Sequence, residues 1–457
     1  MFTERPRTLT TRRDALLAAG ALLGGALLPR VASARGRIAL GGELSMRVPW
    51  PVAAIDPHRL DDAGALLFGA CLFDSLYALD SAGAIVPSLA EGHPESIAEG
   101  TRVTLRDGLR FASGKRLTSR DVVQSMARAR GLGARAWLDA LGPVRAAGAG
   151  AVVFASRAAD HVARTLTSPL TAIVPDHFAP EQPDGTGPFA ARWPGGSSGA
   201  LVLGQNPFAA SGPSILDRVT IAPAPDLAAS LRAFESGEDD LGWLGLGLHE
   251  PRRGAVPFDA GARGWAILRT GDLVRRWNLP GVAQRLADGI EPSRLAHLGV
   301  QPNWTVDPSE GWGGPPVSLL VREDSPWLVE LARAVAAALS RADHDVSVLP
   351  VSAPELSATR ASRGYALAID LVRPFDRTPF GAYAALTEAD DPSRGVEMCR
   401  HPPLGATAAP RTAGRVLSLG VIADVHFSGG HMPDLALPIG SDGIDFGSII
   451  HPRSRVP

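Results

Sequence analysis

A strand, a helix and a second strand follow one another between residues 317 and 349. Residues 317–321 and 346–349 are short apolar runs, and residues 327–340 repeat apolar side chains at helical spacing. Two strands joined by a helix of this length lie parallel in one sheet, with a right-handed crossover. The second half of the chain is therefore predicted to contain an α/β domain.

The first 34 residues have the pattern of an export signal. An apolar run at 15–28 follows several arginines, and Ala-Ser-Ala at 32–34 follows the run as a cleavage site. The run is about 14 residues long, shorter than the roughly 20 that a transmembrane helix needs. Adjacent Arg12 and Arg13 favour the twin-arginine route, and an ordinary secretory signal is the alternative. We expect cleavage after Ala34 and a soluble periplasmic protein.

Composition excludes several classes of protein. The chain has 457 residues, which suggests two or three domains. Its 45 Lys+Arg and 47 Asp+Glu nearly balance, with no block of like charges, so a nucleic-acid interface is not expected. Cys71 and Cys399 form no CxxC motif, so they predict neither a zinc knuckle nor a disulfide framework. One disulfide between them stays open.

The segment 101–126 carries strong local signals. Residues 101–106 alternate polar and apolar, and Asp107-Gly108 supplies a turn before 109–111, which predicts a hairpin. Thr118, with Asp121 three positions later, is a helix N-cap signal. Further helices are expected at 63–77 and 226–235.

Three motifs suggest chemistry but have simpler explanations. Residues 195–199 match the G-x-S-x-G nucleophile elbow around Ser197, although Trp-Pro precedes them and a strand-like segment follows. Residues 185–190 fit a loose G-x-G-x-x-A, but Pro188 has no N–H to offer a phosphate. Metal ligands could come from 343–345 (Asp-His-Asp) or from His426 with His431, yet neither set has zincin spacing.

An ordered set of segments carries the most specific information. The strongest is 105–125, LRDGLRFASGKRLTSRDVVQS. The others are Ile55-Asp56-Pro57, 72–80 (LFDSLYALD), 85–91 (IVPSLAE), 185–189 (GTGPF), 206–208 with 216–217, and 236–241 (SGEDDL). In content and order these segments resemble the family 5 extracellular solute-binding proteins of ABC importers, which include oligopeptide, dipeptide and nickel binding proteins.

The resemblance implies a two-lobed α/β fold of the periplasmic-binding-protein type II, with an extra subdomain in the first lobe. Residues 35–250 and 415–457 would form lobe I, with an inserted subdomain at about 80–175. Residues 251–414 would form a shortened lobe II. In this architecture Gly185-Thr186-Gly187 serves backbone geometry.

The same resemblance bears on the ligand. If Pro379 aligns with the family's proline, Phe375 takes the place of the aspartate that holds the amino terminus of a bound peptide. A buried ammonium would then lack its partner, which disfavours a peptide. Arg373 would instead favour a carboxylate or another acceptor, and an exposed arginine without a role is the alternative.

We therefore predict a non-enzymatic protein that captures a small solute between two lobes and presents it to the permease and ATPase of an importer. No cofactor, metal or nucleic acid is expected, and we expect a monomer. A binding protein diverted to sensing, and a secreted hydrolase using Ser197, are the alternatives. The predicted ligand contacts are Asp56, Phe73, Trp243, Arg373, Phe375 and Asp376.

Overall fold

The structure is a computed structural model. It describes residues 41–80, 83–196, 199–243, 256–258, 264–274, 285–286, 289–291, 293–296, 298, 300, 311–376, 378–401, 412–413, 416–421, 427–429, 439–440 and 443–444. All of them belong to the compact unit formed by residues 40–457. The predicted export signal lies outside the described residues.

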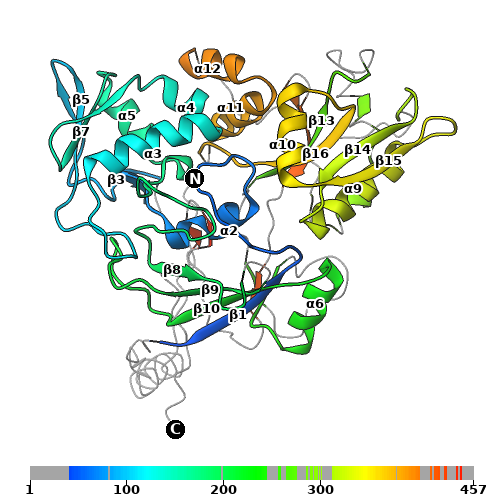
Figure 1. The fold of residues 1–457 in the computed structure, drawn as a ribbon, viewed down its shortest axis with the longest axis horizontal. Helices are drawn as coiled ribbons and strands as arrows, with labels where there is room; N and C mark the ends of the chain where they lie inside the picture. Colours follow the sequence, from blue (N-terminus) through cyan, green and yellow to red (C-terminus); the bar gives the residue numbers. More distant parts are fainter. Residues whose placement is uncertain are drawn as a thin grey trace, which may run out of the picture. The chain divides into compact units, whose positions relative to one another are not determined.

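The first sheet is built mainly from the early part of the chain (Figure 1). At its centre β1 runs parallel to β10 and β11, and antiparallel strands continue the sheet on both sides. Helix α6 (Leu227–Ser236) packs against β1, and its N-terminus is capped by the Asp226 side chain. In spatial order the described strands are β12 (Val256–Phe258), β19 (Phe427–Gly429), β11 (Leu241–Gly242), β1 (Glu43–Val48), β10 (Arg218–Pro223), β9 (Leu201–Gln205) and β8 (Phe189–Arg192).

The second sheet contains the predicted β-α-β unit. Strands β14 and β15 are parallel, and helix α9 (Pro326–Leu339) connects them, as expected. Helix α10 (Ala353–Ser362) leads from β15 to β16, which also lies parallel to β14. In spatial order the described strands are β15 (Val346–Val351), β14 (Val317–Arg322), β16 (Leu367–Val372), β13 (Trp265–Thr270), β18 (Val416–Val421) and β17 (Thr412–Ala413).

A third sheet has its own hydrophobic core. Phe111, Met126 and Phe154 lie in a cluster of buried residues separate from the cluster beneath the first two sheets. Its strands are β4 (Glu95–Ile97), β5 (Gly100–Thr104), β7 (Ala151–Phe154) and β6 (Val144–Ala146), and its helices include α3 (Ser119–Leu132), α4 (Arg135–Asp139) and α5 (Ala159–Thr165).

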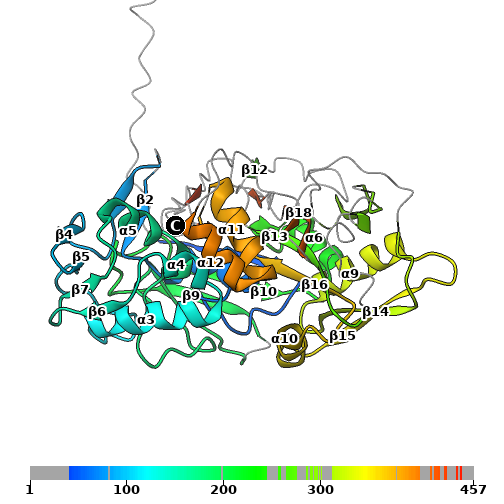
Figure 2. The same cartoon turned by 90° about the horizontal axis from the view of Figure 1, so that it is seen from above.

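Two later helices pack onto this third body. Helices α11 (Pro379–Asp390) and α12 (Pro392–Arg400) contact α4, and Figure 2 shows the three together. Ala385 and Cys399 join the same buried cluster as Phe111. Segments more than 200 positions apart therefore share one core. No disulfide joins Cys399 to Cys71, which is buried in the other cluster.

Two local predictions differ from the structure. The Asp107-Gly108 turn does not close a hairpin, because β5 pairs with β4 and β7. The residues after the turn close a tighter loop, in which the Phe111 N–H donates to the Lys115 carbonyl. The helix expected at 63–77 is α2 (Ala63–Leu72), which ends where Phe73 takes an extended backbone.

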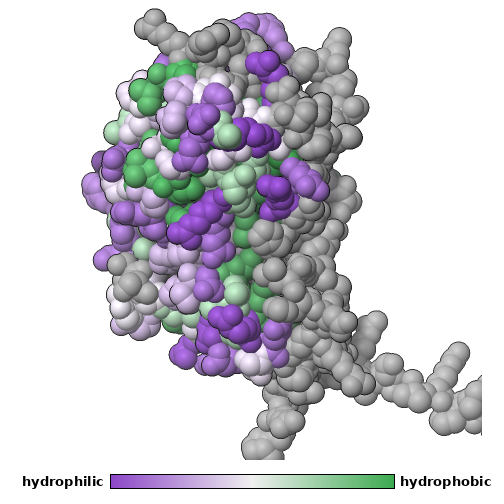
Figure 3. Space-filling model, turned by 90° about the vertical axis from the view of Figure 1, so that its right-hand side faces the viewer, coloured by the Kyte–Doolittle hydropathy of each residue, from purple (hydrophilic) through white to green (hydrophobic). Residues whose placement is uncertain are grey.

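The predicted start of α3 is confirmed. The Asp121 carboxylate accepts hydrogen bonds from the Thr118 N–H, at 2.9 Å, and from the Thr118 hydroxyl, at 2.8 Å. This arrangement is the reciprocal half of a capping box. Among the described residues, no helix has both the length and the apolar character needed to cross a membrane. On the side that carries β14, β15 and α9, hydrophilic and hydrophobic residues are intermingled (Figure 3).

Gly185 and Gly187 allow two backbones to touch. A Cβ added at Gly187 would lie 2.6 Å from the Leu72 carbonyl carbon and 2.9 Å from the Phe73 nitrogen. A Cβ at Gly185 would lie 2.0 Å from the Leu72 carbonyl oxygen. The glycines thus let the segment before β8 lie against the end of α2.

We predict that Gly187→Ala lowers the free energy of unfolding by about 2–3 kcal/mol, because a backbone cannot yield as a side chain does. Urea denaturation measures the change. Gly204→Ala, in β9, is the matched control, since an added Cβ there meets nothing within 4 Å. Equal stability of the two variants would contradict this role for Gly187.

Candidate functional site

A pocket of about 300 Å³ lies where the first and second sheets meet. We call the first sheet with the segments and helices packed on it the first body, and the second sheet with its helices the second body. From the first body the pocket is lined by the segment that follows β1, by the start of α2, and by Pro180 and Glu181. From the second sheet it is lined by the ends of β14 and β16 and the starts of α9 and α10. These positions follow the carboxyl ends of parallel strands, where α/β folds bind ligands.

Three tryptophans support one side of the pocket. Trp50 lines it, while Trp243 and Trp327 lie behind and are almost fully buried. The ring centroids of Trp50 and Trp243 are 4.7 Å apart in an edge-to-face arrangement, and those of Trp50 and Trp327 are 5.9 Å apart. Trp50 and Trp243 follow strands of the first sheet, whereas Trp327 begins α9. The cluster therefore joins the two bodies directly beneath the pocket.

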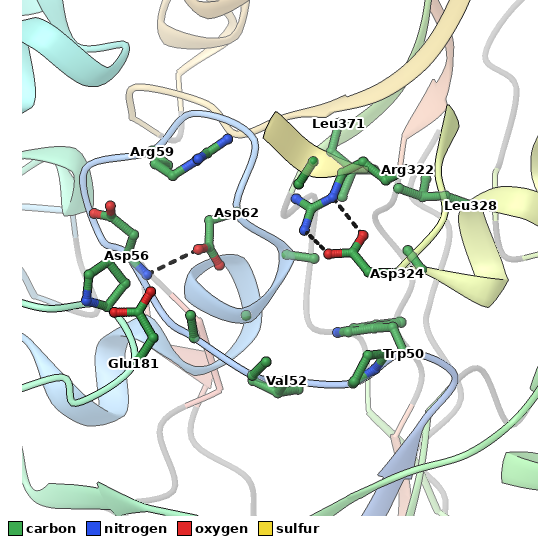
Figure 4. A pocket seen from close by; sticks show the side chains of 18 residues that line it. Trp50, Val52, Asp56, Arg59, Asp62, Glu181, Arg322, Asp324, Leu328 and Leu371 are labelled. Carbon is green, nitrogen blue, oxygen red and sulfur yellow. Dashed lines mark hydrogen bonds and ion pairs between the residues drawn. The ribbon is translucent and has the colours of Figure 1, made fainter. Parts of the chain in front are cut away.

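The charged groups of the pocket differ in their partners. Arg322 binds Asp324 through two hydrogen bonds of 2.9 and 2.6 Å (Figure 4). Asp62 and Glu181 form no ion pair within the described part of the chain. Figure 4 shows Asp62 between Asp56 and the Arg322–Asp324 pair. Arg59 and Arg373 act on Asp62 only from a distance, so the pocket keeps two carboxylates that no described cation binds directly.

Asp62 also has a structural task. Its carboxylate accepts the Ala65 N–H at 2.7 Å, which caps α2, and the Asp56 N–H at 3.0 Å. Burial raises the pKa of Asp62 because the charged form loses hydration, and these two hydrogen bonds only partly offset the effect. A carboxylate has about four acceptor sites, so capacity for a ligand remains.

Asp56 lines the pocket, but its charge is already matched. Arg128 of α3 donates to both carboxylate oxygens, at 2.6 and 2.7 Å. Burial alone would raise the pKa of Asp56, and the bonds from Arg128 outweigh it and lower that pKa. Arg128 also lies over the ring of Phe178, at 4.9 Å from its centroid. Asp56 therefore fixes the pocket segment to α3.

His58 completes this buried cluster. Its Nε2 lies 2.8 Å from the Ala172 carbonyl oxygen, and its Nδ1 lies 3.0 Å from Arg128 Nη1. The first contact needs a proton on Nε2, and the second needs none on Nδ1, which together define a neutral ring. Burial, followed by the nearby Arg128 charge, lowers the pKa of His58 to about 4.

Arg373 and Phe73 lie at a different place. Both line a smaller cavity of about 90 Å³. The Arg373 guanidinium donates to the carbonyl oxygens of Pro57 and Arg59, at 3.0 and 3.2 Å, and the side chain is buried. It thus holds the backbone of the pocket segment without lining the pocket itself.

Phe375, Asp376 and Trp243 do not line the pocket either. Phe375 is fully buried and stacks on Trp137 of α4, with centroids 5.3 Å apart. Asp376 accepts the N–H of Thr378 at 2.8 Å and also its hydroxyl. Burial raises the pKa of Asp376. Of the six predicted contacts, the structure brings only Asp56 to this pocket, and as ligand contacts all six stay predictions.

A chain of ion pairs crosses between the two bodies beside the pocket. Asp61, from the segment after β1, binds Arg59 at 3.0 Å and Arg360 of α10 at 2.8 Å. Arg360 also binds Asp370 of β16, which is 3.2 Å from Arg269 of β13. Each carboxylate is shared by two arginines, so the network fixes the spacing of the elements around the pocket.

Sequence reasoning missed Trp50, Asp62, Glu181, Arg322 and Asp324. Two signals were present. Asp62 directly precedes an apolar helix, which is a typical N-cap position. Arg322 ends a strand predicted to be parallel and Asp324 lies two positions later, at the edge of the sheet where ligands bind. Nothing local in the sequence distinguishes Trp50 or Glu181.

The other chemical motifs gain no support. The described residues contain no group of three His, Cys, Asp or Glu side chains placed to hold a metal. His344 lies in a short loop, with Nδ1 2.6 Å from the Gly314 carbonyl oxygen, and His426 and His431 lie outside the described residues. Ser197 is also outside them. In the sequence it falls between β8 and β9, which pair antiparallel, whereas a nucleophile elbow falls between a strand and a helix.

Comparison with known proteins agrees with the fold. The family model described as "Bacterial extracellular solute-binding proteins, family 5 Middle" matches residues 84–248. This match confirms the resemblance over that segment. No curated protein matches the chain.

Several solved structures share the fold over most of the chain. OppA of Listeria monocytogenes, bound to peptide, has a TM-score of 0.67 at 13% identity, covering 90% of this chain and 99% of its own. The murein tripeptide binding protein MppA of Escherichia coli has a TM-score of 0.67 at 15% identity, covering 90% and 99%. NikA of Staphylococcus aureus, in complex with Ni(L-His)2, has a TM-score of 0.62 at 15% identity, covering 90% and 100%. These likenesses confirm the predicted two-lobed α/β fold, while the predicted domain boundaries stay predictions.

We predict that His58 makes the free energy of unfolding decrease at acidic pH. Its pKa in the folded protein, about 4, lies below the value of 6.5 expected when unfolded, so folding favours the neutral ring. This contribution is fully present above pH 6.5 and is lost as the pH falls towards 4, at a cost of about 3 kcal/mol. The free energy of unfolding, measured by urea denaturation across this range, should reveal it.

The control separates His58 from other acid-sensitive groups. The difference in the free energy of unfolding between the wild type and His58→Gln should shrink as the pH falls from 6.5 to 4. The same substitution at His93, an exposed histidine that forms no ion pair within the described residues, should give a difference that does not follow this pH profile. A constant difference for both variants would contradict the buried neutral ring.

Proposed function

We propose that this chain is an exported solute-binding protein, which captures a small solute in the pocket between its two sheets and delivers it to an ABC importer. One observation carries the proposal: both bodies contribute walls to the same pocket, at the carboxyl ends of their parallel strands. A solute that contacts both bodies favours the arrangement in which they lie together. The match to family 5 and the fold of its structural neighbours support this assignment.

The chemistry of the pocket indicates the class of solute. Asp62 and Glu181 have no cationic partner among the described residues, and Trp50 offers an aromatic surface. A pocket of about 300 Å³ is at the small end of the range for small-molecule sites, about 300–1,000 Å³. We infer a small solute that presents hydrogen-bond donors or a positive charge to the two carboxylates.

This inference replaces the carboxylate solute that Arg373 suggested. The Arg373 guanidinium is directed to backbone carbonyls. The two arginines that line the pocket, Arg59 and Arg322, already bind Asp61 and Asp324. Phe375 is packed against Trp137, so a peptide ammonium finds no carboxylate at that position. Asp62 offers one elsewhere, which leaves a small amine or a short peptide as candidate solutes.

The remaining predictions are part of the same proposal. We infer a monomeric periplasmic protein exported by a twin-arginine signal, without enzymatic activity. A sensor with the same pocket is the alternative, and permease and ATPase genes beside this one would favour the importer. A hydrolase using Ser197 is disfavoured, because the strands before and after that residue in the sequence, β8 and β9, pair antiparallel, whereas a nucleophile elbow lies between a strand and a helix.

A thermal-shift screen of the mature protein tests the proposal. Amines, amino acids, short peptides, sugars and metal ions are compared at equal concentration, with product analysis for each hit. A solute at 100 times its dissociation constant stabilises the folded state by about 2.7 kcal/mol. Stabilisation without turnover is the expected result. Turnover of the stabilising compound would overturn it, and so would the absence of any shift across all classes.

We predict that Asp62→Asn weakens binding of the solute found in that screen by about tenfold or more, because a hydrogen bond to a charged group contributes about 1.5–3 kcal/mol. Asparagine keeps an oxygen for the Ala65 N–H, so the N-cap is retained, but it loses the acceptor of the Asp56 N–H. Urea denaturation of the same variant therefore accompanies the measurement, so that a loss of stability is separated from a loss of solute contact. Isothermal titration calorimetry measures the dissociation constant.

Asp226→Asn is the control for loss of charge at a helix N-cap, because one oxygen of Asp226 caps α6 and the residue lies outside the pocket. Its dissociation constant should equal that of the wild type. An unchanged affinity in Asp62→Asn would show that the solute does not use this carboxylate.

A further inference from the structure

A second hollow, of about 490 Å³, lies beside the first. It is bounded by residues 59–61, by the end of α3 and the start of α4, and by β13, α10 and α11. Arg59 and Leu371 line both hollows. The solute pocket and this hollow thus lie on either side of one short segment and one strand.

Arginines dominate the lining of the second hollow. They come from four separate places in the chain and face two carboxyl groups, Asp61 and Glu388. The five arginines are Arg59, Arg130, Arg135, Arg269 and Arg360. So many guanidinium groups around one hollow create a strong positive potential unless other charges match them.

The matching charges are too few. Asp61 is shared by Arg59 and Arg360, and Asp370 is shared by Arg360 and Arg269. Two carboxylates therefore serve three arginines. The guanidinium donors that these bonds do not use stay available to a ligand, since each arginine has five N–H groups in a fixed fork.

Arg130 and Arg135 have no carboxylate bound to them in the described part of the chain. Arg130 donates to the carbonyl oxygens of Leu138, at 3.0 Å, and Gly142. Burial lowers the pKa of Arg130, and the charge of Asp139, which forms no direct ion pair with it, offsets this effect only in part. Arg135, at the start of α4, is exposed, and neither a hydrogen bond nor an ion pair is formed by its side chain within the described residues.

Glu388 does not restore the balance. Its side chain is only 6% exposed, and its Oε2 has no hydrogen-bond partner among the described residues. Burial raises the pKa of Glu388 to about 7, although the Ala136 N–H and Arg135 of α4 favour the charged form and Asp391 next to α12 opposes it. Cys399 of α12 and Arg269, bound to the Ala389 carbonyl, are the other ionisable groups near it. Near neutral pH this carboxyl is therefore charged only in part.

We propose that the arginine-lined hollow binds a multiply charged oxyanion of the sulfate or phosphate type. Arginine forks match the oxygens of such anions through paired, charge-assisted hydrogen bonds. A bound oxyanion would supply the negative counter-charge that no carboxylate bound to Arg130 or Arg135 provides. It would contact α3 and α4 together with β13 and α10. The ligand is either the free ion or a phosphate group carried by a small molecule, because the hollow is larger than one ion.

Sulfate titration of the mature protein tests the site, with chloride at the same ionic strength to remove general screening. Isothermal titration calorimetry without any organic solute should give saturable binding at one site. Arg135→Gln should weaken it at least tenfold. Arg333→Gln is the matched control, because Arg333 is likewise exposed on a helix, α9, but lies outside this hollow.

Glu388→Gln provides a second, independent readout. An anion beside a carboxyl group favours the protonated form, so the wild type should bind sulfate more tightly at pH 6 than at pH 8, where sulfate itself does not titrate. Glu388→Gln should remove this difference and bind more tightly than the wild type at pH 8. Inorganic phosphate and glycerol phosphate, compared at pH 8, distinguish the free ion from a carried phosphate group.

Non-saturable binding, or equal loss in Arg135→Gln and Arg333→Gln, would overturn the proposal. A wild-type affinity that does not change between pH 6 and pH 8 would contradict the part assigned to Glu388. The titration uses no organic solute, so its failure leaves the proposed solute capture untouched.

Discussion

The segment between β1 and α2 has little regular structure, yet much of it is buried. Buried backbone and carboxyl groups need partners, and here side chains from elsewhere supply them. Arg128 holds the Asp56 carboxylate, Arg373 holds two carbonyl groups, and Asp62 accepts N–H groups from both sides. These contacts come from α3, from the end of β16 and from α2. The pocket wall is therefore only as well ordered as this set of polar contacts.

The solute pocket collects the beginnings of helices. Residues from the first turns of α2, α9 and α10 line it. Each helix start presents unpaired N–H groups and a partial positive charge. Asp62 offsets this charge at α2, and Asp324 lies just before α9. Paired and unpaired carboxylates thus lie beside positive helix ends, which makes this part of the pocket polar. The tryptophan cluster separately gives the pocket an aromatic wall.

Sequence alone predicted the helices and strands better than it predicted the side chains that line the pocket. The β-α-β unit, the capped start of α3 and the helix at 227–236 are present because each depends on nearby residues. The hairpin after Asp107 failed because β7, some 50 positions later, pairs with β5 instead. Trp243 and Phe375 are aromatic residues near the expected cleft, but their rings pack inward against other aromatics. Side-chain direction follows from such distant packing, which a local pattern does not contain.

Arg59 and Leu371 have one hollow on each side. Any change in the shape of this partition alters both volumes at once, in opposite senses. A substitution at Arg59 or Leu371 that is made to change ligand affinity at one hollow will also change the shape of the other. Its effects on the two affinities therefore cannot be separated. Evolution of a new solute preference would meet the same restriction.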